Sequence, residues 1–237
     1  MIIRNTKYVL LFLILLENIT LAQYGGHDWG IYLGYSYTTT SRLYLNPNSL
    51  DPETRDTYIP LHEIFHFSAE VKYKFTPEFA VGLGSEYIET TKSDVNIFVN
   101  DRNIQMTVGY RATPILLSAY YLLPFSTQSF KFDMEGGVGF YFADHIREFG
   151  DATVSKVSQD FSFGIHVGLG MDYMIGDFLS VRFDLKFRDP EITVISKYDQ
   201  ETVTIDDRVY NLPSESFETK TNIDGTTYSL GLVFHIF

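Results

Sequence analysis

The stretch FGIHVGLGMDYMIGDFLSVRFDLKF, from Phe163 to Phe187, decides the fold class of this 237-residue chain. Large apolar residues occupy every odd position from Phe163 to Tyr173, with Gly, His or Asp between them. After Gly176-Asp177 the alternation resumes, now with Ser, Arg, Asp and Lys as the intervening residues. A period of two indicates β-strands, because a helix would repeat its apolar residues at spacings of three and four. The pattern predicts an antiparallel pair of strands and raises the question of which face is inside.

The same alternation recurs in eight segments and predicts an all-β chain. The segments are 29–37, 65–75, 79–87, 105–122, 130–142, 163–173, 179–187 and 226–237. The 17 Tyr and 20 Phe residues also favour strands. The fourth segment is the least regular, because Pro114 and the run Ile115-Leu116-Leu117 blur its parity, and a proline inside a strand usually marks an edge or a bulge. In the last segment the bulky residues take even positions, which leaves the register near Phe237 open.

The connections between these segments alternate in length. Three are short, at 76–78, 124–129 and 176–177, and carry Gly, Pro and Asp, which are turn residues. Four are long and polar, at 39–62, 90–103, 144–159 and 189–224. Loops beyond about 12–15 residues are usually functional or disordered. In the last one, the alternation around Thr202, Thr204, Val209 and Tyr210 predicts a hairpin that stands above the rest of the fold.

The number of large residues on each strand decides which face points into the barrel. The interior of an eight-stranded barrel is just wide enough to be filled by side chains, so five or six large residues from each strand would overfill it. The small and polar residues fit there, and the apolar face then needs lipid. The strand lengths match the roughly 9–11 residues of a tilted transmembrane strand, and closure pairs every backbone group. We therefore predict an eight-stranded antiparallel up-and-down transmembrane β-barrel with short periplasmic turns and four long extracellular loops. The alternative is a soluble lipocalin-like barrel or β-sandwich, which would need hydrophilic outer faces.

The N-terminal residues 1–22 have the composition of a secretory signal peptide. Arg4 and Lys7 precede a short apolar run from Tyr8 to Leu16, and small residues end the segment before Gln23. A membrane-anchoring helix is the alternative, but the run is about half the roughly 20 residues that span a bilayer. We expect export and a single barrel domain at 23–237. The chain has no cysteine, which excludes disulfides and thiolate metal sites, and a net charge of −12, which argues against nucleic acid as a partner.

Three stretches carry a resemblance to a known family. EGGVGFYFADH (135–145), the opening stretch and the terminal GLVFHIF (231–237) resemble the small eight-stranded outer-membrane barrels of the OmpA, OmpX and OmpW kind. The resemblance covers most of 23–237. It implies an integral monomer in the outer membrane of a Gram-negative bacterium, surrounded by outer-membrane lipid and inserted by the barrel assembly machinery.

The inward face carries charges of both signs, and we expect them to pair because charges excluded from water need partners. The predicted structural ion-pair network in the lumen comprises Glu70, Lys72, Lys131, Asp133, Glu135, Asp172, Arg182, Asp184 and Lys186. Lys74, Glu86 and Arg188 share that face. The alternative is that these charges line a polar conduit.

The six histidines suggest no catalytic, metal or cofactor site. His62 and His66 fall on one face of a strand but too far apart to chelate one ion. His166 shares its strand with Ser162 and Asp172, whereas a catalytic triad needs its members within hydrogen-bond reach.

The leading functional hypothesis is therefore a non-enzymatic barrel that anchors its extracellular loops, which would serve surface interactions or envelope integrity. Asp144, Glu148 and Asp151 join the acidic last loop in a negatively charged rim that could bind a cation or a protein, or could simply be solvated. One alternative is a narrow porin-like channel for small or hydrophobic compounds. Another is a lipid A-modifying enzyme that uses His62, His66 or His145.

Overall fold

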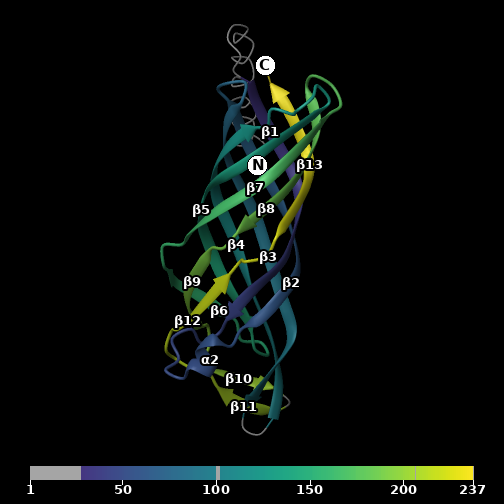
Figure 1. Cartoon of the computed structure of the whole chain (residues 1–237). Helices are drawn as coiled ribbons and strands as arrows, with labels where there is room; N and C mark the ends of the chain where they lie inside the picture. Colours follow the sequence, from purple (N-terminus) through teal and green to yellow (C-terminus); the bar gives the residue numbers. More distant parts are fainter. Residues whose placement is uncertain (1–27, 100–101, 206, 237) are drawn as a thin grey trace, which may run out of the picture.

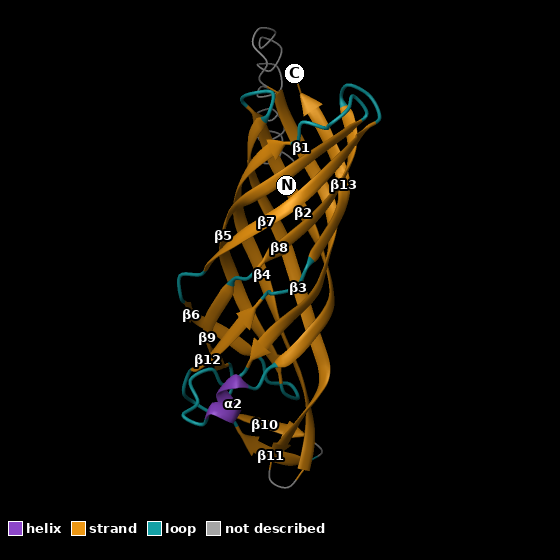
Figure 2. Ribbon diagram, in the orientation of Figure 1, coloured by secondary structure: helices purple, strands orange, loops and turns teal. Residues whose placement is uncertain are grey.

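Eight long strands close into a tall barrel in the computed structural model, which describes residues 28–99, 102–205 and 207–236 (Figures 1 and 2). The strands are β1 (Asp28–Tyr44), β2 (Ile59–Lys74), β3 (Phe79–Val99), β4 (Arg102–Leu122), β5 (Phe130–Glu148), β7 (Phe163–Met174), β8 (Leu179–Arg188) and β13 (Thr227–Ile236). Each pairs antiparallel with the next in this order, and β13 pairs back with β1. The predicted all-β, up-and-down, eight-stranded barrel is confirmed. The expected signal peptide, 1–22, lies outside the described residues.

The outer surface of the ring is an apolar belt. On β7, Phe163, Ile165, Val167 and Leu169 are each at least 50% exposed, while the residues between them are buried. Among the described residues, the outward-facing charges nearest to the belt at the long-loop end are Glu63, Glu89, Arg111, Asp144, Asp160 and Asp189. So continuous an apolar surface is stable only against lipid. The odd face of the stretch 163–173 therefore faces the bilayer, as predicted.

The structure settles the two strands whose register the sequence left open. On β4 the alternation is strict, with Ile115 and Leu117 outward and Leu116 inward. Pro114 marks neither an edge nor a bulge, since its strand pairs with β3 and β5 on both sides. Because proline has no N–H, the β3–β4 pairing is interrupted between Ser85↔Ile115 and Ile88↔Ala112, and the Ser85 hydroxyl donates to the Pro114 carbonyl at 2.8 Å. On β13 the even residues face outward.

The long connections contain far more regular structure than the sequence indicated. β1 to β5 continue beyond the belt, and two of the long connections form five further strands: β6 (Val154–Gln159) in one, and β9 (Glu191–Tyr198), β12 (Phe217–Asn222) and the hairpin of β10 (Thr202–Ile205) with β11 (Arg208–Asn211) in the other. Above the end of β13, β12 takes over the pairing with β1, and β9 and β6 follow. The hairpin predicted around Thr202 and Tyr210 is confirmed. We call the part beyond the belt, residues 38–64, 88–112, 143–160 and 189–226, the extracellular extension.

Helix contributes little to the fold. α2 (Pro52–Asp56) is a single turn capped by the Asp51 carboxylate, which accepts from the Thr54 amide. Among the described residues, no helix is long and apolar enough to cross a membrane.

The interior of the extracellular extension is apolar, unlike the charged lumen inside the belt. Its buried core includes Leu43, Leu61, Ile64, Ile88, Val108, Tyr110, Ile192 and Ile223. A change of parity in β2 contributes to this core: Leu61 and Ile64 both point inward although they are three residues apart, with Glu63 between them at φ +57°. A positive φ at a non-glycine residue turns the strand locally, and the β1–β2 register is the same on both sides of Glu63, with Thr38↔Ile64 and Thr40↔His62 paired.

Candidate functional site

Arg182 on β8 is the centre of the charged layer in the lumen. Its two terminal nitrogens donate to both oxygens of Asp133 at 2.7 and 2.8 Å, and one of them also donates to Asp172 at 2.7 Å. Asp184 lies 2.7 Å from the same guanidinium. Lys72, 4.0 Å from Asp133, adds a second positive charge to this group of buried carboxylates. These five residues belong to the predicted network and come together from β2, β5, β7 and β8.

A second charged layer lies toward the extracellular extension and is centred on Glu86 of β3. Arg188 donates to Glu86 at 2.6 Å, and Lys186 lies 3.6 Å from Glu86 and 3.7 Å from Glu135. Arg188 also reaches the hydroxyls of Thr38 and Thr227 at 3.4 Å. The layer therefore connects β3 and β5 with β8 and with the neighbouring strands β1 and β13.

Two members of the predicted network take other roles. Glu70 accepts a hydrogen bond from the Tyr120 hydroxyl at 2.6 Å, and the Lys72 ammonium lies 3.6 Å from the centre of the same ring. Lys131 lines a cavity at the periplasmic mouth and lies opposite Asp172 in the β5–β7 register. Tyr120 was not among the predicted site residues, because a tyrosine on an inward face gives no sign of which charges it will bridge.

Side chains fill the lumen at two levels. The mouth at the short-turn end holds a cavity of about 290 Å³, lined by Trp29, Met174 and the turn residues Pro77 and Asp177 among others. A separate cavity lined by Tyr32, Arg182 and Lys186, among others, measures about 20 Å³, which is room for about one water molecule. The apolar core fills the interior of the extracellular extension.

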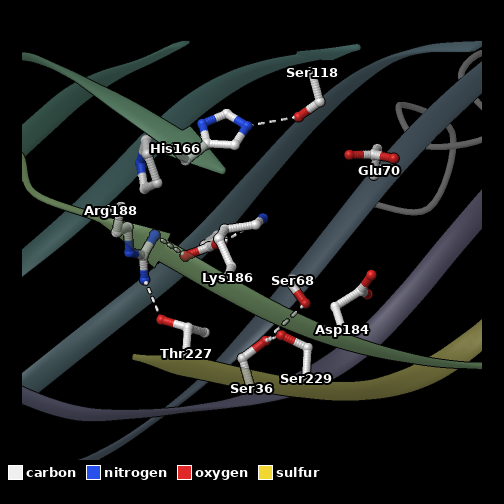
Figure 3. Close-up of polar contacts among 12 residues, drawn as sticks. Ser36, Ser68, Glu70, Ser118, His166, Asp184, Lys186, Arg188, Thr227 and Ser229 are labelled. Carbon is white, nitrogen blue, oxygen red and sulfur yellow. Dashed lines mark hydrogen bonds and ion pairs between the residues drawn. The ribbon is translucent and has the colours of Figure 1, made fainter. Parts of the chain in front are cut away.

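The histidines are placed differently from the sequence expectation. His62 is exposed and His66 is buried, so they do not share a face, because the parity of β2 changes at Glu63 between them. His166 hydrogen-bonds Ser118 of β4 at 2.8 Å rather than Ser162 (Figure 3), and its second ring nitrogen has no partner among the described residues. Within the described part of the chain, no group of three or more His, Asp or Glu side chains is placed to hold a metal ion.

A seam separates β5 from β6 just above the belt. The last backbone bond between β5 and the segment before β7 joins the Tyr141 amide to the Ser162 carbonyl at 3.0 Å. Beyond it the Gln159 side chain takes the place of a peptide group: it accepts from the Ala143 amide at 2.9 Å and donates to the Tyr141 carbonyl at 2.6 Å. Lys156 donates to the Ala143 carbonyl and pairs with Asp144, both at 2.9 Å. Side chains therefore bridge the two strands along the seam.

Comparison with known proteins supports the fold. No protein-family model matches the chain. No curated protein is similar to it. Among solved structures, the outer membrane protein OprG from Pseudomonas aeruginosa is 14% identical with a TM-score of 0.58, and the alignment covers 90% of this chain and 97% of OprG. Neisserial surface protein A is 12% identical (TM-score 0.49; 90% and 100% covered), and the outer membrane protease OmpT from Escherichia coli is 10% identical (0.47; 90% and 97%).

At this level of identity the likeness to OprG shows the fold. Together with the lipid-facing belt, it gives this chain the fold of an integral outer membrane β-barrel, as the resemblance in its sequence implied. The activity is a separate question.

Proposed function

We propose that the barrel is a closed membrane anchor that presents its extracellular extension for binding at the cell surface. The observation that supports the proposal is the filling of the lumen by side chains, in the charged layers around Arg182 and Glu86 and in the apolar core above them. Side chains fill the lumen of such a barrel, so the surface available for binding a partner is the extracellular extension. The proposal includes insertion by the barrel assembly machinery and a monomeric state.

The charge of the extension favours a basic partner. The last connection, 189–224, carries nine Asp and Glu residues against three Lys and Arg residues. An acidic surface attracts positively charged proteins and cations over a distance set by the salt concentration. A basic extracellular protein surface fits this rim.

The proposal assigns no catalytic role. The Ser118–His166 pair lies buried inside the barrel, and the free ring nitrogen of His166 has no carboxylate partner among the described residues. A serine nucleophile needs a base that is itself oriented by a third group, and a path for substrate.

Single-channel recording on the refolded chain from Gln23 to Phe237 tests the proposal. We expect stable insertion into a planar bilayer, shown by a folded band that shifts on heating in SDS gels, without discrete conductance steps. Reproducible steps would contradict the anchor and favour the narrow channel. In parallel, a basic peptide such as polylysine should bind the reconstituted barrel in low salt. Replacing residues 200–212 with a short Gly-Ser linker should weaken that binding.

A further inference from the structure

Arg147 occupies an unusual position in the extracellular extension. It points inward from β5 beyond the belt, with its guanidinium carbon 4.3 Å from the centre of the Phe217 ring and the Tyr198 hydroxyl beside it. His145, one pleat earlier on the same face, contacts the Thr219 hydroxyl at 3.3 Å and meets Phe217 edge to face. The surroundings of Arg147 are therefore aromatic.

Arg147 has no acidic partner among the described residues. The other two buried arginines, Arg182 and Arg188, each contact carboxylates within 2.7 Å. At Arg147, Nε and Nη2 are buried without any hydrogen bond, and burial lowers the pKa of the guanidinium. A charge taken out of water is costly unless it is paired. The guanidinium of Arg147 therefore lacks the negative charge that would compensate it.

The two Arg147 nitrogens without hydrogen bonds indicate which chemical group could supply the missing negative charge. Nε and Nη2 lie on the same edge of the guanidinium plane, and their N–H groups run parallel. This is the fork that binds two oxygens of one carboxylate or phosphate. An ordered water could satisfy one of these donors but would bring no charge.

The seam between β5 and β6 lies close to Arg147, because Tyr198, beside the guanidinium, pairs with Val154 of β6. It is bridged by the side chains of Gln159 and Lys156, which can move without breaking a strand ladder. It also lies next to the outer rim of the belt, where Phe142 and Phe161 are 56% and 79% exposed. Lys156, on the rim of the seam, supplies a second positive charge.

We propose that Arg147 and Lys156 form a binding site for a phosphate group at the β5–β6 seam. Arg147 holds two phosphate oxygens through Nε and Nη2, Phe217 and Tyr198 form the walls, and Lys156 moves from Asp144 to the ligand. The phosphate belongs either to the headgroup of an outer-leaflet lipid or to a soluble molecule. This site does not depend on whether the lumen conducts.

The test uses the whole refolded barrel with inorganic phosphate as the probe, titrated at constant ionic strength in zwitterionic micelles. We expect saturable movement of one arginine Nε–H resonance, which is absent from Arg147→Gln, and a rise in the thermal midpoint. Arg147→Lys keeps the charge but loses the fork, so its affinity should fall by about tenfold or more. Arg42→Gln is the matched control, because Arg42 also lies over an aromatic ring, Tyr58, but already pairs with Asp224 at 2.9 Å.

A second arm distinguishes the two sources of phosphate. The same resonance and midpoint are followed in phosphatidylcholine vesicles with and without phosphatidic acid. A response to phosphatidic acid alone assigns a lipid headgroup, and a response to free phosphate assigns a soluble ligand. The proposal is overturned if the wild-type chain responds to neither, or if Arg147→Gln or Arg147→Lys responds as the wild type does.

Discussion

Arg182 is the single residue that holds the largest number of lumen carboxylates together, with Asp133, Asp172 and Asp184 all within 2.8 Å. We predict that Arg182→Met lowers the free energy of unfolding by about 3–5 kcal/mol, because it leaves buried carboxylates without their counter-ion. Urea titration of the barrel in lipid vesicles measures this change. Arg111→Met removes an exposed partner of Glu89 and should cost less than about 1 kcal/mol. Equal effects of the two substitutions would contradict a lumen held together by Arg182.

At this scale the sequence predicted which residues face inward but not which of them meet. Alternation assigns Arg182 and Asp133 to the same face, yet their contact depends on how β5, β7 and β8 are shifted against each other. The hydrogen-bond partner of His166 could not be predicted from the sequence for the same reason. Ser118 lies two strands away, and its position is fixed by the β4–β5 and β5–β7 registers, which a single sequence does not reveal.

The seam between β5 and β6 is the element that we expect to open most easily. Gln159→Ala removes both side-chain bonds to Tyr141 and Ala143. At about 0.5–1.5 kcal/mol for each hydrogen bond, exchange of the Ala143 amide should become about tenfold faster. Hydrogen exchange measured by NMR checks this, with Val167 in the belt as the internal reference. Gln200→Ala, which removes an exposed bond to Asp151, should leave Ala143 unchanged; unaltered exchange in Gln159→Ala would show that the seam is held by other contacts.

Element boundaries beyond the belt could not be read from the sequence, for a physical reason. Inside the belt, lipid on one face and a charged lumen on the other enforce a strict period of two. In the extracellular extension, water replaces lipid and an apolar core replaces the charges, so the contrast between the faces is reversed. The parity of β2 then changes at Glu63, which has a positive φ, and glutamate is not a residue type that marks a positive φ. Apart from the hairpin of β10 and β11, the connecting strands there were predicted as loops.

The whole molecule thus combines two kinds of core in one continuous barrel, and we expect them to differ in their response to mutation. Leu61 is 2% exposed in the apolar core of the extension, and Leu61→Ala should cost about 2–5 kcal/mol there. The loss should appear as faster hydrogen exchange at residues 104–112, with residues 165–171 and the heat-dependent gel shift unchanged. Leu50→Ala, at a fully exposed leucine, is the matched control.

This separation follows from what each part needs in order to fold. The membrane part is held by closure of its backbone ladder in lipid, where an unpaired N–H or C=O costs several kcal/mol. The extension is held by burial of side chains, as in a soluble domain. A substitution that weakens the apolar core therefore opens the extension alone, because opening the barrel in the bilayer costs more free energy. If Leu61→Ala abolished the gel shift or accelerated exchange in the belt, the two parts would unfold as one unit, and the extension would be needed to hold the anchor closed.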